Sequence, residues 1–294
     1  MTETHLLKGK PLADTLRQEI SAEIARLKAG GVMPLMAVIV ASADPAAIKY
    51  AEAKQRAAEK LGIEIDLIRF DPSLGQAALE TLVAELSGEA RVHGILLELP
   101  LAGGLKAEPA IGHIDPEKDV DGLTAANLGL IAAGNEAAAI APATPLACIR
   151  LAESAAPLAG RRAVVIGRGR SVGRALIPML INRDATVTIC HTKTPDLRAA
   201  IDPCDFVFVA AGRAGLIGGD HLRDGQIVID AGINVVADGA GGEKMVGDVD
   251  AAGAIDTVAA LSPVPGGVGP LTSTIVFANL MRAIALQRAA ADRA

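Results

Sequence analysis

Short apolar runs alternate with helical segments along most of this chain, and the alternation restricts the folds open to it. In the first half, strand-like runs at residues 35–41, 63–69 and 92–97 are separated by helical patterns at 46–61 and 74–86. Strands that are linked by crossover helices of this length form parallel sheets. The first half is therefore predicted to be a parallel α/β domain.

A second series of strands begins after a stretch that is rich in Gly, Asp and Asn. Its short, mostly β-branched or aromatic runs lie at residues 163–166, 186–190, 206–210 and 227–230. The final helix, about 272–291, follows a Pro/Gly stretch, and we expect it to pack back onto the first domain. The pattern predicts an α/β protein of two domains, formed by residues 1–141 plus 271–294 and by residues 142–270.

Composition and charge argue against several other classes of protein. The formal net charge is −6, so no global basic field is available to hold nucleic acid or an anionic membrane. No apolar run looks long enough to span a bilayer, and residues 1–10 lack the pattern of a secretory signal. Cys148, Cys190 and Cys204 are too far apart in sequence to indicate a disulfide framework or a metal site. We expect a cytoplasmic protein with no metal, nucleic-acid or membrane partner.

Residues 163–173 have the order strand, glycine turn and helix start. Gly167, Gly169 and Gly173 allow a tight turn and the close approach of a pyrophosphate to the start of a helix. The spacing is GxGxxxG, one residue longer than the usual dinucleotide fingerprint. Taken alone, the run fits a dinucleotide site or a plain glycine turn.

The end of the next strand indicates which dinucleotide would bind. NAD-binding units usually place an acid there to hold both ribose hydroxyls. Here residues 191–194 read His-Thr-Lys-Thr, and Arg168 and Arg170 stand in the glycine turn. Cations and hydroxyls in place of an acid favour the extra phosphate of NADP. The alternative is that Lys193 and Arg170 are only solvated charges.

Lys54 is the one charged residue on the apolar stripe of the helical pattern at residues 46–61. Tyr50, the only tyrosine of the chain, precedes it by one helical turn, so the two side chains are neighbours. In one interpretation the lysine stem packs while the ammonium reaches water. In the other, the amine faces a cleft and serves in acid–base chemistry.

Three further segments are candidates for a binding site. Glu98 follows a buried apolar run, and ligands gather at the carboxyl ends of parallel strands. Asp121, in the turn at residues 118–122, could accept two hydrogen bonds from an amino-pyrimidine edge, or the turn could be a simple acidic one. The Pro/Gly run at 262–270 could bring backbone amides to a flat ligand or act as a hinge.

Taken together, these segments resemble the bifunctional methylenetetrahydrofolate dehydrogenase/methenyltetrahydrofolate cyclohydrolase family, in family order through nearly the whole chain. The matching pieces are Tyr50-x-x-x-Lys54, residues 94–101, 118–122, 144–145, 167–173, 190–194, 230–234 and 247–249, and the run from Pro263 to Pro270. The last run is highly specific to the family.

The resemblance implies an N-terminal three-layer α/β folate-site domain, a Rossmann-type NADP-binding domain, an active site in the cleft between them, and a homodimer. NADP would oxidise 5,10-methylenetetrahydrofolate to the methenyl form, and hydrolysis would then give 10-formyltetrahydrofolate. In such a site Lys54 would be the acid–base residue, with Glu98 and Tyr50 beside it. The implied substrate contacts are Tyr50, Asp121, Pro265, Gly266 and Gly267. The implied cofactor contacts are Gly167, Arg168, Gly169, Arg170, Ser171, Gly173, His191, Thr192, Ala211, Gly212 and Ile233.

Glu98 is the departure from the family pattern with the largest chemical consequence, because the family usually has Gln there. A carboxylate beside Lys54 favours the ammonium form, whereas water addition needs a group that can accept a proton. We therefore predict that dehydrogenase activity is retained and that the cyclohydrolase step is weakened, unless Glu98 is protonated and acts as Gln does. The other functions considered are an NADP-linked shikimate-type dehydrogenase and a non-catalytic folate- and NADP-binding paralogue.

Overall fold

The computed structural model describes residues 3–42, 44–239 and 242–292. Its contacts divide the chain into two compact units. One unit combines the N-terminal segment up to Asp14 with Thr144–Thr272, and the other combines Thr15–Ala143 with the C-terminal segment from Ser273. The grouping of residues 3–14 differs from the predicted boundaries, which placed the whole N-terminus with the other unit. The physical cause is a short strand, described below, that joins the second sheet.

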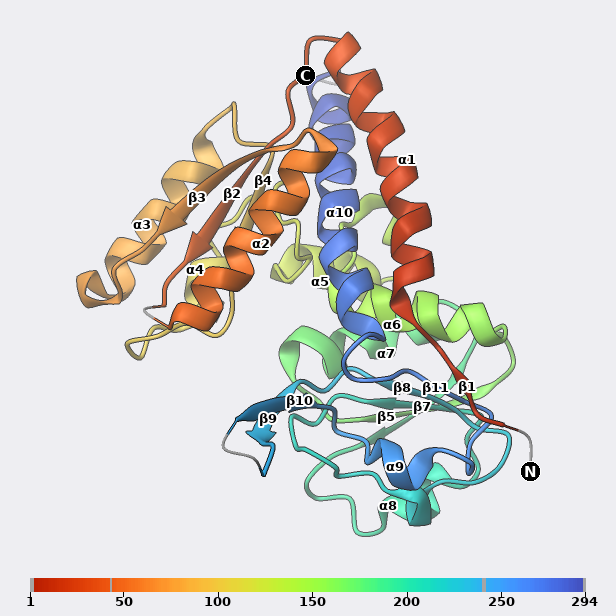
Figure 1. The fold of residues 1–294 in the computed structure, drawn as a ribbon. Coiled ribbons are helices and arrows are strands. Elements are labelled where there is room, and N and C mark those ends of the chain that lie inside the picture. The colour runs from red at the N-terminus through yellow and green to blue at the C-terminus, as the bar shows by residue number, and fades with distance from the viewer. Residues whose placement is uncertain (1–2, 43, 240–241, 293–294) are drawn as a thin grey trace. The chain divides into compact units, whose positions relative to one another are not determined.

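The unit that contains Thr15–Ala143 is built on three parallel strands in the order β3-β2-β4 (Figure 1). Its elements are β2 (Leu35–Val40), α2 (Pro45–Leu61), β3 (Glu64–Arg69), α3 (Gly75–Gly88), β4 (Gly94–Leu97), α4 (Ala107–Ile111) and α5 (Ala125–Ala132). Because β3 and β4 flank β2 on opposite sides, right-handed crossovers place α2 and α3 on opposite faces of the sheet. The predicted strands and crossover helices are thus confirmed.

The two longest helices, α1 (Gly9–Ala29) and α10 (Val268–Ala291), each begin in one unit and continue in the other. Within the unit of the three-stranded sheet, α10 is fixed by the side-chain amides of a buried Asn and a partly buried Gln. Asn279 Nδ2 donates to the carbonyls of Val120 and Ala141 at 2.8 and 2.9 Å. Gln287 Nε2 donates to the carbonyls of His93 and Glu117, both at 2.8 Å. The final helix therefore packs on the first domain, as predicted.

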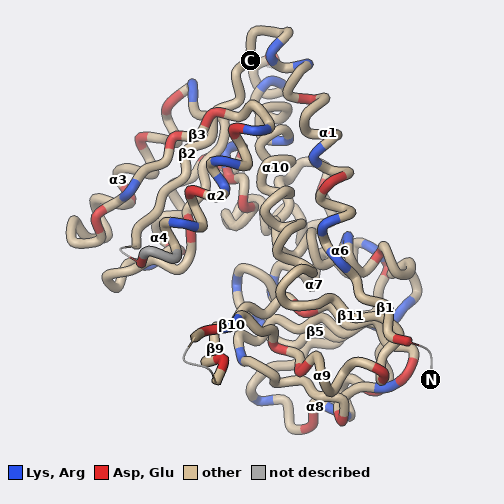
Figure 2. Tube along the Cα trace, in the orientation of Figure 1, with Lys and Arg blue, Asp and Glu red and all other residues tan. Residues whose placement is uncertain are grey.

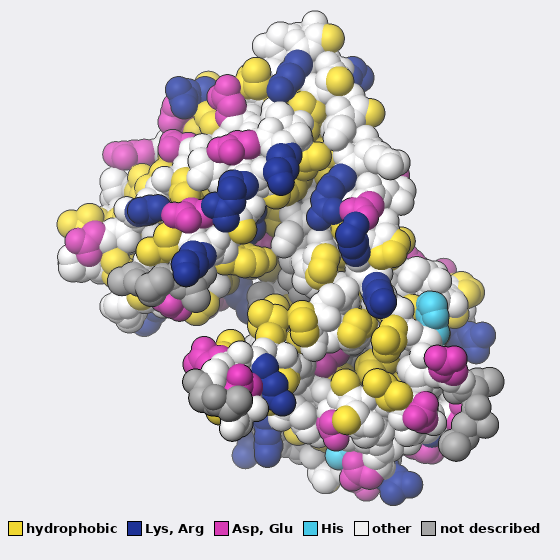
Figure 3. Space-filling model, in the orientation of Figure 1, with side chains coloured by type: hydrophobic (Ala, Val, Ile, Leu, Met, Phe, Trp, Pro, Cys, Tyr) yellow, Lys and Arg dark blue, Asp and Glu magenta, His cyan; other side chains and the backbone are white. Residues whose placement is uncertain are grey.

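By length and composition alone, α10 is one helix that could cross a membrane, with a mean hydropathy of 1.3 in its most apolar window. This corrects the expectation that no segment was long and apolar enough. Of that window, 61% is buried inside the structure, so its apolar side chains are accounted for by packing. Basic and acidic residues are intermixed along α1 and α2 (Figure 2), and the face shown in Figure 3 has Lys and Arg side chains with some Asp and Glu between them over these helices.

The other unit is built on a six-stranded parallel sheet in the order β1-β11-β8-β7-β5-β6. Its strands are β1 (His5–Leu6), β5 (Arg162–Ile166), β6 (Thr186–Cys190), β7 (Phe206–Val209), β8 (Ile227–Asp230) and β11 (Ala260–Leu261). The other elements are α6 (Ala143–Ala155), α7 (Ala175–Ile181), α8 (Leu197–Ile201), α9 (Ala251–Ala254) and the antiparallel pair β9 (Asn234–Ala237) and β10 (Glu243–Val246). β6 and β7 pair with β5 on its two opposite sides, so the order in which the chain adds strands to the sheet reverses at β5. Ligands of doubly wound sheets bind at such a reversal, outside the carboxyl ends of the strands.

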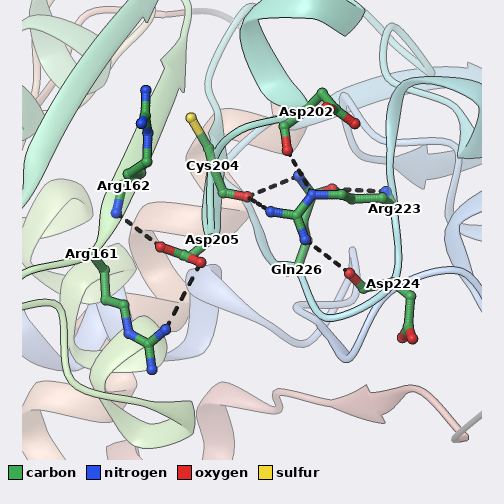
Figure 4. Close-up of polar contacts among 8 residues, drawn as sticks. All are labelled: Arg161, Arg162, Asp202, Cys204, Asp205, Arg223, Asp224 and Gln226. Atoms are coloured by element: carbon green, nitrogen blue, oxygen red, sulfur yellow. Dashed lines mark hydrogen bonds and ion pairs between the residues drawn. The ribbon is translucent and has the colours of Figure 1, made fainter.

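A polar network lies at the amino ends of β7 and β8, two interior strands of this sheet (Figure 4). The fully buried Gln226 donates through Nε2 to the carbonyls of Ile201 and Cys204 at 3.1 and 3.0 Å. Arg223 Nη2 also donates to the Cys204 carbonyl, at 3.0 Å, and its Nε donates to the Asp202 carbonyl at 2.6 Å. These bonds satisfy carbonyls of the turn at residues 201–204, some of which are buried, so we assign the network a structural role.

Candidate functional site

A pocket of about 610 Å³ opens at the carboxyl ends of β5, β6, β7 and β8. Nine of the predicted cofactor contacts line it, namely Gly167, Arg168, Gly169, Ser171, His191, Thr192, Ala211, Gly212 and Ile233. Arg170 and Gly173 do not line it, although both lie in the turn that does. The structure thus gathers residues from four separate loops at the predicted place.

The glycine turn after β5 is shaped by two contacts that no other residue would permit. Gly167 has φ of +112°, and a Cβ there would lie 2.0 Å from the Ala210 carbonyl oxygen. A Cβ on Gly173 would lie 2.3 Å from the Gly167 carbonyl oxygen. Gly173 therefore lets the helix start pack directly on the turn, although it does not face the pocket. Local geometry explains two of the three glycines of the fingerprint, Gly167 and Gly173.

The extra residue in the GxGxxxG spacing is taken up by a single π-helical turn over Arg170–Arg174. The Arg174 amide donates to the Gly169 carbonyl, five residues earlier, at 2.9 Å. A π-turn holds one more residue than an α-turn and often occurs at functional sites. The unusual spacing is consequently compatible with a dinucleotide-type turn.

The loop after β6 contributes His191, Thr192 and Thr194 to the pocket lining, and no Asp or Glu. The His191 amide donates to Thr194 Oγ1 at 2.9 Å, and the Lys193 amide donates to His191 Nδ1 at 3.1 Å. Thr194 and Arg213 also line the pocket, and neither was among the predicted contacts. Thr194 is part of the His-Thr-Lys-Thr run and could have been chosen from it. The lining residues include Arg168 and Arg213 but no Asp or Glu, which suits a ligand with several phosphates.

In the other unit, Lys54 Nζ forms a short ion pair with Glu98 Oε1. The two side chains are 8% and 14% exposed. Lys54 Nζ also lies 5.1 Å from the ring centroid of Tyr50, within the range of a cation–π contact. This burial disagrees with the interpretation in which the ammonium reaches water. Lys54 instead belongs to a small polar cluster on an otherwise apolar face of α2.

Tyr50 differs from Lys54 in exposure. It is 54% exposed, and its hydroxyl lies 3.2 Å from Ser273 Oγ on α10, where either oxygen can donate. The ring is therefore held at one end while much of its surface stays open. Such a ring can pack against a flat ligand.

The turn at residues 118–122 combines residues whose side chains hydrogen-bond to the backbone with one carboxylate that does not. Asp119 is buried, and its oxygens accept hydrogen bonds from the amides of Gly122 and Thr124 at 2.9 and 2.7 Å. Lys118 Nζ donates to the carbonyls of residues 87 and 89. Within the described part of the chain, no hydrogen bond reaches the carboxylate of Asp121. Only Asp121 is thus left to meet a ligand.

Burial raises the pKa of Asp121 to about 7, and the negative charge of Asp119 adds to the shift. The charge of Lys54 lowers this pKa and that of Glu98 raises it, so Asp121 senses the ion pair electrostatically. A buried carboxyl whose pKa is shifted and that lies near other charged groups is typical of functional sites. The predicted residues Lys54, Glu98, Tyr50 and Asp121 all belong to this unit.

Pro265, Gly266 and Gly267 belong to the unit of the six-stranded sheet. The Gly9 amide, at the start of α1, donates to the Gly266 carbonyl at 2.9 Å. The Gly267 amide donates to the Pro263 carbonyl at 2.7 Å, which closes a tight turn. A backbone-rich loop of this kind fits the predicted contact with a flat ligand. The placement of a catalytic cleft between the two domains stays a prediction.

The doubly wound sheet and its acid-free pocket define a dinucleotide-binding α/β protein. Residues 142–288 match the family described as tetrahydrofolate dehydrogenase/cyclohydrolase, NAD(P)-binding domain, and residues 7–121 match the catalytic domain of the same family. The chain belongs to the tetrahydrofolate dehydrogenase/cyclohydrolase family.

Individual relatives are similar to this chain over almost its whole length. A bifunctional FolD protein of Heliobacterium modesticaldum is 44% identical over 96% of this chain and 96% of its own length. One from Deinococcus radiodurans is 45% identical over 98% and 95%. The solved Campylobacter jejuni FolD enzyme has a TM-score of 0.91 at 35% identity, covering 97% of this chain and 99% of its own. The Trypanosoma brucei FolD structure, a complex with NADP and an inhibitor, has a TM-score of 0.91 at 33% identity, covering 99% of both chains. Because the chain belongs to this family, the alternative of a shikimate-type dehydrogenase is set aside.

Proposed function

We propose that this chain is an NADP-dependent methylenetetrahydrofolate dehydrogenase that also carries a methenyltetrahydrofolate cyclohydrolase site. One observation carries the proposal. This chain has both a dinucleotide pocket with no Asp or Glu among its lining residues and a buried Lys54–Glu98 pair. The first provides a place for NADP, and the second provides an amine removed from bulk water.

The pocket residues fit NADP rather than NAD. Gly167 and Gly173 permit the close backbone approach that a pyrophosphate needs. Arg168 and Thr192 line the pocket and would hold the 2′-phosphate. An acid at the end of β6 would repel that phosphate, and the residue there is His191. When bound, NADP supplies the oxidant that takes a hydride from the methylene carbon. The protein supplies placement and electrostatics.

The folate would be held by Tyr50, Asp121 and the loop from Pro265 to Gly267. The exposed ring of Tyr50 offers a packing surface, and the carboxylate form of Asp121 can accept two hydrogen bonds from an amino-pyrimidine edge. Lys54 would be the acid–base residue. Because loss of a hydride leaves a cation, a nearby Glu98 carboxylate stabilises that charge as it develops.

The second step, hydrolysis of the methenyl group, needs a proton acceptor, whereas the first step does not. Water addition to the methenyl carbon releases a proton, which a base must accept. An ammonium that is held by a carboxylate is a poor acceptor. We therefore propose that the cyclohydrolase step is slow in this chain compared with the dehydrogenase step, so that methenyltetrahydrofolate accumulates.

A single spectrophotometric assay tests the function. The protein is mixed with methylenetetrahydrofolate and either NADP or NAD, and the reduced cofactor and methenyl-folate are followed by absorbance. We expect equal amounts of both products with NADP, and slower formation with NAD. An absence of folate-dependent cofactor reduction would contradict the proposal and favour the non-catalytic paralogue.

We also propose that the protein is a homodimer, because the resemblance implies one. We propose a cytoplasmic location, because the three buried cysteines are all free thiols, as in proteins of a reducing compartment. Sedimentation analysis tests the dimer directly. A monomer at micromolar concentration would contradict this part of the proposal without affecting the proposed activity.

A further inference from the structure

Asp248 lies two residues after β10, and its carboxylate is enclosed by backbone amides of the loop that follows β7. Its Oδ2 atom accepts hydrogen bonds from the amides of Ala211 and Gly212 at 2.6 and 2.8 Å. Its Oδ1 atom accepts one from the Arg213 amide at 2.8 Å. Asp248 is fully buried, so these bonds replace its contact with water.

Three successive amides can meet one carboxylate only in a concave backbone conformation. Gly212 supplies it with φ of +66°. Such an arrangement of consecutive N–H groups binds anions, and here the anion is the protein's own side chain. Ala211, Gly212 and Arg213 all line the dinucleotide pocket, whereas Asp248 does not. The carboxylate therefore shapes the pocket wall from behind.

The same carboxylate also holds a second part of the wall. Asn234 Nδ2 donates to Asp248 Oδ1 at 2.9 Å, and the preceding residue, Ile233, lines the pocket. Asp248 thus ties the loop after β7 to the loop after β8.

A second buried acid fixes Asp248 to the sheet. Asp230, the last residue of β8, accepts hydrogen bonds from the amides of Gly232, Asp248 and Val249 at 2.8, 3.1 and 2.9 Å. Two glycines leave room for the carboxylates. A Cβ on Gly232 would lie 2.2 Å from Asp248 Cγ, and a Cβ on Gly247 would lie 1.8 Å from Asp230 Oδ2. The Asp-Ala-Gly and Gly-Asp-Val segments of the sequence are accounted for by this arrangement.

We propose that Asp248 is a positioning residue for the dinucleotide, acting through the backbone of residues 211–213 and through Asn234. The inference rests on the proposed NADP function. Replacing the carboxylate with the isosteric amide of Asn sets an NH₂ group against backbone donors, so at least one loop must move. The pocket wall would then lose its shape although no pocket-lining side chain had changed.

The test compares two isosteric substitutions of buried carboxylates. Asp119→Asn is the matched control, because Asp119 is also buried and also accepts two backbone amides, but lies in the other unit. The Kd for NADPH is measured by fluorescence titration of each folded variant, together with its thermal midpoint. We expect both variants to be less stable, and only Asp248→Asn to bind NADPH about tenfold more weakly, which corresponds to about 1.4 kcal/mol.

A purely structural role would lower the thermal midpoint of Asp248→Asn and leave its Kd within twofold of the natural protein, which overturns the inference. If that variant does not fold, Asn234→Ala removes one of the same hydrogen bonds and decides the question. A threefold rise in its Kd supports the inference, and an unchanged Kd overturns it. Failure of the proposed function is distinguishable, because the unaltered protein would then bind no NADPH.

Discussion

Lys54 on α2 and Glu98 after β4 form an ion pair in which both side chains are largely removed from solvent, at 8% and 14% exposure. The pair joins α2, the crossover helix between β2 and β3, to the residue that follows β4. Asp121, whose pKa is raised to about 7 mainly by burial, is influenced by both charges. The charges of the ion pair therefore act on the pKa of Asp121.

Removing Lys54 alone should strongly destabilise the fold. Lys54→Met leaves the Glu98 carboxylate largely buried without its partner, and we expect a loss of about 3 kcal/mol in the free energy of unfolding. The double variant Lys54→Met with Glu98→Gln should recover much of that loss, because no buried charge remains. Denaturant unfolding of the two variants measures both values. Equal stability of the single and double variants would show that the pair is not energetically coupled.

The pH dependence of stability should report Asp121. Its pKa is raised to about 7, above the ordinary value near 4 of an unfolded Asp, so the folded protein binds the proton more tightly. The resulting stabilisation is complete below about pH 4 and is lost as the pH rises through about 7. Asp121→Asn cannot titrate. We expect the natural protein to lose stability relative to this variant between pH 5 and pH 8, and a constant difference would contradict the assigned burial.

Gly173 should be essential for cofactor affinity although it does not line the pocket. In Gly173→Ala the new Cβ would meet the Gly167 carbonyl at 2.3 Å, so the turn must open. We expect the Kd for NADPH to rise by at least about tenfold. Gly129→Ala, on α5, is the control, since its Cβ meets no atom within 4 Å. Isothermal titration of both variants makes the comparison, and equal affinities would refute the close-packing argument.

Gly9 should affect folate binding without affecting NADP. A Cβ on Gly9 would lie 2.0 Å from the Gly267 carbonyl oxygen, so Gly9→Ala displaces the loop that contains Pro265 and Gly266. We expect a several-fold higher KM for methylenetetrahydrofolate and an unchanged KM for NADP. Gly88→Ala, with no neighbouring atom within 4 Å of its Cβ, serves as the control. A rise in both KM values would indicate general damage to the unit.

The features that the sequence predicts well are those set by local patterns. The strand, glycine turn and helix start at residues 162–174 depend on neighbouring residues, and the pocket forms there. Helical periodicity places Lys54 on the apolar face of its helix, but it does not decide whether the ammonium is buried or reaches water. The π-helical turn was not predicted, since GxGxxxG spacing does not specify how the extra residue is accommodated.

Features set by distant contacts could not be read from the sequence. The role of Asp248 depends on amides 35 to 37 residues away. The two residues of β1 are too few to give a strand pattern, and they pair with β11, which lies more than 250 residues further on. Asp119 and Asp121 look equivalent in one short turn. Only the fold shows that Asp119 binds backbone amides, while the carboxylate of Asp121 makes no hydrogen bond within the described residues.

The most direct measurement of the central claim is the rate of methenyltetrahydrofolate hydrolysis by the natural protein and by Glu98→Gln, with the dehydrogenase rate of each as the internal reference. If the carboxylate holds Lys54 as an ammonium, the substitution should raise hydrolysis about tenfold or more, the effect expected from freeing a proton acceptor, while NADP reduction changes little. Equal hydrolysis by the two proteins, with dehydrogenase activity intact, would contradict the claim that the Lys54–Glu98 pair favours the first step over the second.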